Sequence, residues 1–407
     1  MPRGGTVAAF SGRKPKLIVD LRQTGANQRV RVDMGETIRI LQVFGGLNRG
    51  GSETAIMNVY RHIDRSKCQF DFVVHGDQRY EYEDEVRALG GRIYRFPRFQ
   101  LQGLVSYIRS WRELFRQHPE YRVIHGHFFT ISAVYLGVAR EFGLSCIAHS
   151  HIADVNGVRA FAIRLMTFPV RRIADHHFAC SRRAGAWLYG KGILKKQSFH
   201  FVPNAIDPAA FAFNLEARIK KRRELGLEGR FALGHVGRFE TQKNHAFLLQ
   251  VFNKLRAIND RAVLVLVGDG QLQKEISDSA RSLGIANSVL FTGSRADVQE
   301  ILQAIDVFVL PSYYEGLPLT LVEAQGAGLP CVVSENVTRE VDITDLIERV
   351  SLRDPADTWA RRIDRYSRGF QRRNRGAEIA KSGFDAKSSA HWLSEFYTTI
   401  HLSRDTL

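Results

Sequence analysis

The 407-residue chain is poor in cysteine. Its four cysteines, none of them in a C-x-x-C pair, are Cys68, Cys146, Cys180 and Cys331. This spacing argues against a structural zinc site and against a disulfide framework, and it favours a reducing compartment. No stretch reaches the ~20 apolar residues that span a bilayer, and the basic N-terminus lacks the apolar core of a signal peptide. We therefore expect a cytoplasmic protein that does not pass through a membrane.

Acidic residues are outnumbered by basic ones, 42 to 58, which gives a net charge of +16. Such an excess calls for an anionic partner: nucleic acid, anionic lipid or a phosphorylated substrate. The basic residues cluster at 158–173, 220–223 and 361–375. The first cluster interleaves basic and apolar residues, which is typical of a surface attracted to an anionic membrane. A soluble basic helix packed on its sheet would have the same pattern. The third cluster is expected to be a solvated face.

Short β-branched or aromatic runs alternate with longer stretches patterned as helices. The runs lie at 38–44, 70–75, 123–127, 145–150, 176–180, 231–237, 262–268, 289–293, 307–311 and 330–334. Alternation of strands with helices of about 10–15 residues predicts βαβ units and parallel sheets. The fold class is therefore α/β, with two Rossmann-like, doubly wound parallel-sheet domains. Active sites of such domains lie beyond the carboxyl ends of the strands, here in a cleft across which the domains face each other.

Prolines mark a boundary between the two halves, at Pro203 and Pro208. The last part of the chain has an apolar stripe typical of an amphipathic helix. We expect residues 1–36 to be a basic, disordered arm and residues 37–202 to be the first domain. The second domain then covers residues 203–385, and the final helix covers residues 386–404.

Two loops have features of a phosphate site. Residues 45–53, GGLNRGGSE, join the first strand to the first helix, and Gly50 and Gly51 permit a phosphate to approach the positive helix N-terminus. In GRFETQKN, residues 237–244, Arg238 and Lys243 can converge on a diphosphate. The plainer interpretations are a flexible turn and two solvated cations.

Two histidine pairs end successive strands. His125 and His127 point to one face of their strand because side chains alternate, and His149 and His151 repeat the pattern one strand later. At a carboxyl end facing a cleft, a histidine can position a substrate hydroxyl or transfer a proton. Two pairs also suggest a metal, but no carboxylate cluster accompanies them and the chain has no Asp-x-Asp. We therefore predict no metal site.

Two glutamates, Glu315 and Glu323, lie in an otherwise apolar segment, YYEGLPLTLVEAQGAGLP. We expect a helix with Pro318 in its first turn and with Glu323 inside it. The N–H groups of Gly316, Leu317 and Leu319 are then available to donate hydrogen bonds to an anion. Eight helical residues span about 12 Å, more than the roughly 5–9.5 Å of a hydrolase carboxylate pair. The acids therefore fit two ends of one elongated, polyhydroxylated ligand.

The segment E-G-L-P-L-T-L-V-E resembles the E-x7-E motif of retaining glycosyltransferases of family 4, which have the GT-B fold. The match extends from about residue 38 to 350 and includes NRGGSETAIMNV, HGHFFTISAVYLG, FVPNAID, HVGRFETQKN and VGDG. The segments AHSH and SENVTREVDITD resemble the branch that builds capsular polysaccharides and exopolysaccharides.

This resemblance implies that a sugar is transferred from a nucleoside diphosphate sugar, expected to be a UDP sugar, with retention of anomeric configuration and without a cofactor or metal. The implied acceptor is a lipid-linked saccharide that binds the first domain, residues 37–202, while the second domain, residues 203–385, binds the nucleotide sugar. A lipid-linked acceptor would place the first domain on the inner face of the cytoplasmic membrane, with 158–173 as the candidate contact. The family's C-terminal helix crosses back to the first domain, which implies the same for residues 386–404.

The resemblance also implies roles for single residues. Glu323 would hold the ribose hydroxyls, and Glu315 would contact the donor sugar or the reacting face. Arg238 and Lys243 would neutralise the diphosphate, with Gly50 and Gly51 approaching it from the first domain. His127, or less so His125, would lie near the donor sugar, with His149 and His151 as possible substrate contacts. Leu317 departs from the Gly or Phe that is usual after E-G, which leaves the donor sugar open.

Two other functions remain open. A nucleotide-sugar epimerase on a similar scaffold would act without an acceptor. A basic nucleic-acid-binding protein would bind with steep salt dependence, but the chain has no recognisable nucleic-acid module and the two glutamates would be unexplained. We therefore expect no nucleic-acid partner.

Overall fold

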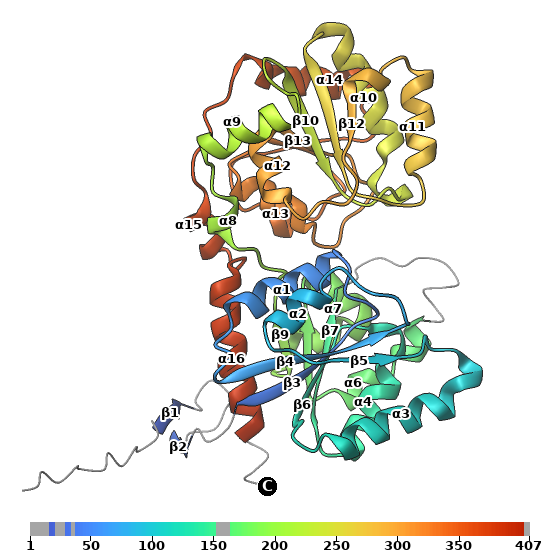
Figure 1. Cartoon of the computed structure of the whole chain (residues 1–407), viewed down its shortest axis with the longest axis vertical. Helices are drawn as coiled ribbons and strands as arrows, with labels where there is room; N and C mark the ends of the chain where they lie inside the picture. The colour runs from blue at the N-terminus through green and yellow to red at the C-terminus, as the bar shows by residue number, and fades with distance from the viewer. Residues whose placement is uncertain (1–15, 21–28, 34–36, 152–162, 403–407) are drawn as a thin grey trace, which may run out of the picture.

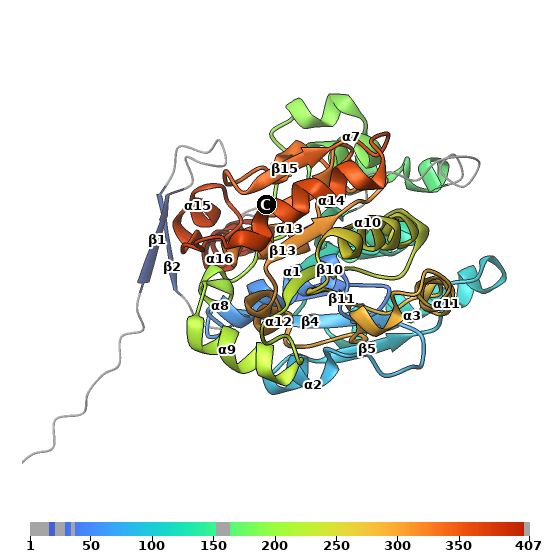
Figure 2. The same ribbon diagram turned by 90° about the horizontal axis from the view of Figure 1, so that it is seen from above.

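The computed structural model describes residues 16–20, 29–33, 37–151 and 163–402. It contains two α/β domains that lie one above the other along the long axis (Figure 1). Seen from above, the domains overlap, with the C-terminal domain over the N-terminal one (Figure 2).

The N-terminal domain is built on a seven-stranded parallel sheet. Across the sheet its strands are β5 (Ile93–Phe96), β4 (Cys68–His75), β3 (Ile38–Val43), β6 (Val123–Gly126), β7 (Ser145–Ser150), β8 (His176–Ala179) and β9 (Phe199–Phe201). One face packs on α1 (Gly51–His62), α2 (Glu83–Ala88) and the C-terminal helix α16 (Ala386–Leu402). The other face packs on α3 (Leu104–Gln117), α4 (Ser132–Glu141), α6 (Val170–Ile173) and α7 (Arg182–Tyr189).

The C-terminal domain has a six-stranded parallel sheet. Its strands, in order, are β12 (Val289–Phe291), β11 (Ala262–Val267), β10 (Phe231–Val236), β13 (Val307–Leu310), β14 (Cys331–Ser334) and β15 (Ile347–Val350). One face packs on α8 (Pro208–Phe211), α12 (Val298–Ala304), α13 (Leu319–Gly326) and α15 (Gly376–Lys381). The other packs on α10 (His245–Ile258), α11 (Gln273–Ser282) and α14 (Ala356–Asp364), while α9 (Leu215–Glu224) lies against α12.

Short 3-10 turns complete the two domains. They are η2 (Leu101–Gly103), η3 (Phe129–Ile131), η4 (Lys191–Lys195), η5 (Thr241–Lys243), η6 (Ala286–Ser288), η7 (Arg339–Val341) and η8 (Arg365–Arg368). Among the helices of the described residues, none is long and apolar enough to span a bilayer.

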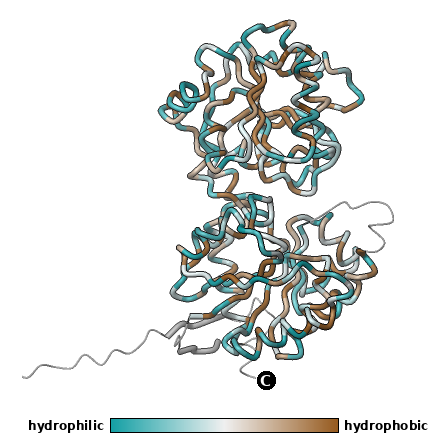
Figure 3. The backbone as a smooth tube through the Cα atoms, turned by 45° about the vertical axis from the view of Figure 1, so that its right-hand side comes forward, coloured by the Kyte–Doolittle hydropathy of each residue, from teal (hydrophilic) through white to brown (hydrophobic). Residues whose placement is uncertain are grey.

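The predicted α/β fold with two parallel-sheet domains is confirmed, and the ten predicted strands are present with ends within two residues of those expected. Hydropathy explains this success, because the central strands are the most apolar parts of each domain (Figure 3). The prediction missed β5, β9 and β15, which are short, partly exposed edge strands whose apolar residues are interrupted by polar ones. A half-exposed strand has no continuous apolar run to reveal it.

The N-terminal arm differs from the expectation of disorder. Residues 16–20 (β1) and 29–33 (β2) pair as an antiparallel hairpin. Their sequences, KLIVD and RVRVD, carry the β-branched residues that favour strands. The rest of the arm lies outside the described residues.

Two segments of chain connect the domains and lie side by side. Ile206, in the first crossing, forms a parallel bridge with Asp385 in the second. The N–H of Ile206 donates to the carbonyl of Phe384 at 2.9 Å, and the N–H of Ala386 donates to the carbonyl of Ile206 at 2.7 Å. After this crossing α16 returns along the N-terminal domain and packs against α1 (Figure 1).

Candidate functional site

Loops at the carboxyl ends of the two sheets meet between the domains. Leu317, which follows β13, packs against a small cluster that includes Ala179 and Cys180, at the end of β8. The hydroxyl of Ser294, after β12, donates to Glu81 of the N-terminal domain at 3.3 Å. Most of the residues that the sequence singled out lie on these loops or at the ends of these strands, and Glu323 lies in the helix α13 that follows β13.

The two glutamates lie at the start of α13. Glu315 is on the preceding loop and Glu323 is inside the helix, as we expected, but Pro318 is not in the first turn. It is the residue before the helix, with extended backbone angles (φ −74°, ψ 99°), so that Leu319 is the first helical residue. Gly316 and Leu317 lie before the helix. The first N–H groups of a helix have no intrahelical partner, so those at Leu319 and Thr320 are available to an anion.

Glu315 is buried in a closed polar cage. Its Oε1 accepts from Lys243 Nζ at 2.6 Å and from the Ser312 hydroxyl at 2.7 Å, and its Oε2 accepts from Gln242 Nε2 at 3.2 Å. The side chains of Glu315 and Lys243 are 6% and 17% exposed. Asn244, in the left-handed region (φ 57°), ends the turn η5 that presents Lys243 to this acid. The structure therefore brings Lys243 and Glu315 together.

Glu323 is buried and has no partner. Within the described residues, no group donates a hydrogen bond to its carboxyl oxygens. Removal from water without a compensating charge raises the pKa of Glu323 to about 7. A carboxyl group in this state is ready to accept hydrogen bonds from a ligand that enters the site.

The other predicted diphosphate residues have more exposed surroundings. Arg238 is 73% exposed and lies 3.1 Å from Glu240. Gly50 is the N-cap of α1, and a side chain there would collide with the carboxylate of Glu53. Burial raises the pKa of Glu53, while Arg238 acts against that rise from across the domain boundary. Gly51 is exposed. The glycine loop therefore accommodates Glu53, an acid that the sequence analysis did not consider.

The four histidines form two hydrogen-bonded pairs. His125 Nε2 lies 3.2 Å from His149 Nδ1, and His127 Nδ1 lies 2.8 Å from His151 Nε2. His127 also stacks on Phe44, with ring centroids 4.2 Å apart. Strand register explains the meeting, because β6 and β7 are parallel neighbours and each ends in a histidine pair.

Three further residues join the histidines to the rest of the molecule. Tyr397 of α16 places its hydroxyl 2.7 Å from His125 Nδ1, and it accepts from Gln42 Nε2 at 3.4 Å. Gln42 Oε1 lies 2.9 Å from His127 Nε2, so this nitrogen carries the proton and donates. Asn204, in the first domain crossing, lies 3.1 Å from His151. Both ring nitrogens of His127 are thus engaged, and His127 reaches a substrate only when one of these bonds breaks.

Burial keeps these histidines neutral. It lowers the pKa values of His125, His127 and His149 well below 6.5, and the neighbouring histidine rings add to this effect. Burial also lowers the pKa of His151, to about 4. Nitrogens of the first three lie within 4.8 Å of one another, which is close enough to hold a metal ion. Most of these nitrogens already have hydrogen-bond partners. The exception is His149 Nε2, which has no hydrogen-bond partner of good geometry among the described residues. The absence of a metal stays a prediction.

Sequence reasoning missed Gln42, Tyr397, Asn204, Ser312 and Gln242, all of which fix the predicted residues. Gln42 carried a readable signal, since it is a polar residue in a fully buried stretch of strand. Asn204 lies in the motif FVPNAID that was already noted. The contact of Tyr397 depends on where α16 docks, which local pattern does not specify.

Models of two protein families match the chain. "Glycosyl transferase 4-like domain" matches residues 50–205, and "Glycosyl transferases group 1" matches residues 217–382. The two matches thus fall on the N-terminal and the C-terminal domain.

Curated relatives include proteins of nearly the same length. The protein EpsF of Bacillus subtilis (strain 168), named as a glycosyltransferase, is 36% identical over 373 residues, which cover 88% of this chain and 96% of the relative. A UDP-Gal:alpha-D-GlcNAc-diphosphoundecaprenol alpha-1,3-galactosyltransferase of Escherichia coli is 28% identical over 242 residues, which cover 57% of this chain and 62% of the relative.

Solved structures share the fold. HepE of Anabaena in complex with UDP-glucose superposes with a TM-score of 0.68 at 18% identity, covering 91% of this chain and all of that one. WaaG, a glycosyltransferase involved in lipopolysaccharide biosynthesis, gives 0.63 at 15% identity over 88% of this chain and 95% of its own. These neighbours are GT-B glycosyltransferases, which confirms the predicted fold. The chain therefore belongs to the group 1 glycosyltransferases.

Proposed function

We propose that the protein transfers a sugar from a UDP sugar to a lipid-linked saccharide, with retention of anomeric configuration, in the biosynthesis of a surface polysaccharide. The observation that carries this proposal is the arrangement at α13. A caged lysine–glutamate pair lies beside the start of the helix, and an unpaired, buried carboxyl lies inside it.

In this proposal the donor spans the start of α13. The carboxyl of Glu323 accepts from the ribose hydroxyls, which fill its empty hydrogen-bonding positions. The diphosphate lies against the helix N-terminus, where Lys243 and Arg238 neutralise it. When Lys243 turns from Glu315 to the diphosphate, Glu315 is released to accept from hydroxyls of the donor sugar.

The chemical step breaks the bond between the anomeric carbon and the diphosphate oxygen, and the electron pair leaves with the diphosphate. An acceptor hydroxyl forms the new bond, and its proton passes to the departing phosphate. Lys243, Arg238 and the α13 N–H groups stabilise the charge that develops on the leaving group. His127, at the end of β6, positions the donor sugar. No metal or other cofactor is required in this scheme.

The relatives support the choice of substrates. The fold is similar to that of HepE, which was solved with UDP-glucose. The name of the E. coli relative gives UDP-Gal as donor and a diphosphoundecaprenol-linked saccharide as acceptor. A third relative, 40% identical over 161 residues, is a Vi polysaccharide biosynthesis protein of Salmonella typhi, and these residues cover 39% of this chain and 27% of the relative.

Release of the nucleoside diphosphate tests the proposal. Wild type is assayed with UDP, GDP and ADP sugars, with and without a lipid extract, beside Glu323→Gln and the control Glu275→Gln on the exposed side of α11. We expect lipid-dependent release from a UDP sugar that Glu323→Gln loses and Glu275→Gln keeps, and NMR of the product gives its anomeric configuration. Conversion of a donor to its epimer without lipid, or salt-sensitive RNA binding without turnover, would contradict the proposal.

We also propose that the N-terminal domain lies on the inner face of the cytoplasmic membrane. Residues 163–206 carry eight Lys and Arg residues and a single acid, Asp175. Four large apolar residues of this range are exposed, Leu165 by 67%, Met166 by 41%, Phe168 by 53% and Phe201 by 43%. Part of the predicted contact, residues 158–162, lies outside the described residues.

A hollow of about 470 Å³ lies within this surface, lined by Phe168, Arg171, Arg172, Lys191 and Lys196 among others. The guanidinium of Arg171 lies 5.1 Å from the centre of the Phe168 ring. Basic residues around an exposed aromatic suit a lipid phosphate beside acyl chains, and each contributes about 1 kcal/mol near an anionic surface.

Flotation with vesicles tests the membrane contact. We expect wild type to float with phosphatidylglycerol vesicles but not with phosphatidylcholine vesicles, and to be released by salt. Replacing Lys191 and Arg172 by Glu should abolish flotation, whereas Arg353→Glu, in the C-terminal domain, should not. Equal flotation of the three proteins would contradict this part of the proposal.

A further inference from the structure

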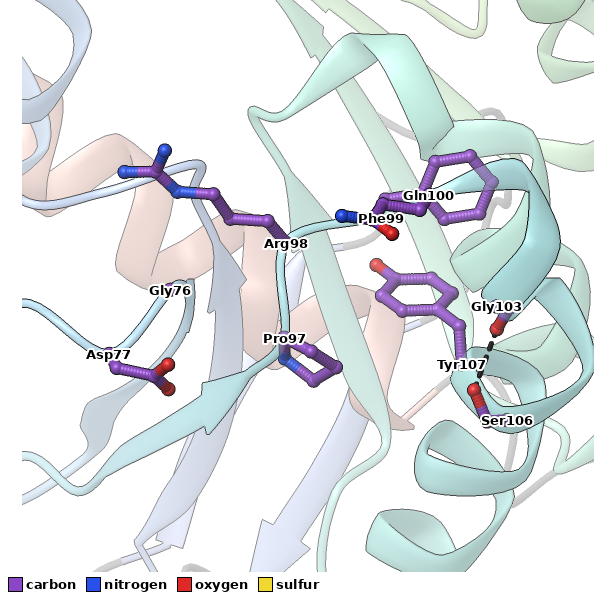
Figure 4. Close-up of a pocket in the computed structure, with 9 residues that line it drawn as sticks. All are labelled: Gly76, Asp77, Pro97, Arg98, Phe99, Gln100, Gly103, Ser106 and Tyr107. Carbon is purple, nitrogen blue, oxygen red and sulfur yellow. Dashed lines mark hydrogen bonds between the residues drawn. The ribbon is translucent and has the colours of Figure 1, made fainter.

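A second hollow of about 500 Å³ lies in the N-terminal domain, at the carboxyl ends of β4 and β5 (Figure 4). Its lining includes Gly76, Asp77, Arg98, Phe99, Gln100 and Tyr107. In the sheet, β4 is two strands away from β6, where His127 lies. Two strand spacings are about 10 Å. The hollow and the candidate donor site therefore lie at the same edge of one sheet, close enough for one extended ligand to reach both.

The charged groups of this hollow do not neutralise each other. Asp77 has no ion-pair or hydrogen-bond partner within the described residues. Among the residues that the structure describes, Arg98 donates only to Gln78 Oε1, at 3.1 Å, and forms no ion pair with an acidic residue. Both side chains are exposed. An acceptor-only carboxylate and a five-donor guanidinium are thus both open to a neutral, polyhydroxylated ligand.

An aromatic wall closes the other side of the hollow. The ring of Phe99 meets that of Tyr107 edge to face, with centroids 5.3 Å apart. Tyr107 is held in place by its hydroxyl, which lies 2.8 Å from His75 Nε2. Figure 4 shows the two rings together, across the hollow from Asp77. Phe99 is only half-buried, so that part of its apolar surface remains uncovered.

The backbone at Gly76 contributes to this arrangement. Gly76 has a φ of 102°, which disfavours any side chain. A Cβ atom there would also lie 3.3 Å from Arg98 Nε and from the Tyr80 hydroxyl. The glycine therefore lets Arg98 lie closely over the turn that follows β4.

We propose that this hollow binds the saccharide of the acceptor. A pyranose ring has one apolar C–H face and a rim of hydroxyl groups. The Phe99 ring covers that apolar face, Asp77 accepts from the hydroxyls and Arg98 donates to them. A lipid tail would leave both charges without partners, whereas a saccharide satisfies both groups and the aromatic wall. This inference rests on the proposed function, because it identifies the second substrate of the same reaction.

Saturation-transfer NMR with soluble glycosides tests the inference. The probes are octyl β-glucoside, octyl β-galactoside and octyl N-acetyl-β-glucosaminide, each with saturating UDP. We expect at least one to bind wild type, and its affinity to fall about tenfold in Phe99→Ala and in Asp77→Asn, as for loss of one stacking or charge-assisted contact. Arg109→Ala, on the exposed side of α3, is the matched control and should bind as wild type does.

Binding of UDP, measured by calorimetry on the same proteins, separates this inference from the proposed function. All four should bind UDP equally. If UDP binds but no probe binds wild type, or if the two variants bind the probe as well as the control does, the inference about the hollow is overturned. If wild type fails to bind UDP, the proposed function itself is overturned.

Discussion

Glu323→Gln should stabilise the protein at high pH, because glutamine has the shape of the protonated acid and cannot ionise. Burial raises the pKa of Glu323 from 4.5 to about 7. The folded protein therefore holds this proton more tightly than the unfolded chain does, and the contribution of Glu323 to stability falls as the pH rises from 4.5 through 7. At 1.36 kcal/mol per pKa unit, the full penalty above pH 7 is about 3 kcal/mol.

The variant removes this penalty. Relative to wild type, its free energy of unfolding should be higher by about 3 kcal/mol at pH 8 but by only about 1 kcal/mol at pH 5. Urea unfolding followed by circular dichroism at the two pH values measures the difference. The control Glu275→Gln, on the exposed side of α11, should show no such dependence on pH.

A Glu323→Gln effect that is the same at pH 5 and pH 8 would refute the reasoning, because it would mean that the buried carboxyl does not ionise in this range. Nucleotide binding should change in the opposite direction from stability. The amide replaces a carboxylate that would otherwise accept from two ribose hydroxyls, so UDP affinity at pH 8 should fall about tenfold in calorimetry.

Three further results are expected. Lys243→Met leaves the buried carboxylate of Glu315 without its cation, so the free energy of unfolding, measured by thermal or urea unfolding, should fall by about 3 kcal/mol. The double variant Lys243→Met with Glu315→Gln should recover part of this loss. An undiminished loss in the double variant would contradict the pairing. Tyr397→Phe keeps the ring but removes the hydroxyl between His125 and Gln42, and it should lower the free energy of unfolding by about 1–2 kcal/mol. Dialysis against EDTA should leave turnover unchanged, and mass spectrometry of the purified protein should find well under one bound transition metal per chain; a stoichiometric metal that is lost on mutation of His149 would contradict the predicted metal independence.

Much of the fold could be predicted because the central strands are apolar along their whole length. The run AVLVLV of β11 is buried at every position, and a sheet covered on both faces requires such a run. Of the four edge strands of the two large sheets, only β12 was found in this way, and β5, β9 and β15 were missed. The sequence of β15, IERV, places two charged residues on a half-exposed strand, and its pairing with β14 depends on a neighbour that is distant in sequence.

The site could be predicted as far as residue types and strand ends determine it. Histidines that end neighbouring parallel strands must lie close together, which is why the two pairs meet. The partners of these residues could not be predicted in the same way. Lys243 forms an ion pair with Glu315, which is 72 positions further along the chain, and only the docking of the turn η5 against the loop after β13 brings them together. Glu53 was missed because its side chain bends back to lie beside Gly50. This contact depends on the side-chain rotamer and on the space left by the glycine, neither of which a sequence pattern specifies.

The two crossings between the domains have a mechanical consequence. A single connection would leave the domains free to swing and twist about it, but here two adjacent segments are bonded to each other through Ile206. Such a double band can bend across its width, whereas twisting would shear its hydrogen bonds. On the N-terminal side the band is clamped, since the Asn58 amide donates to the carbonyl of Ala205 at 2.9 Å. Bending at this band should therefore be easier than twisting, so that we expect any opening of the molecule to be mainly a hinge motion.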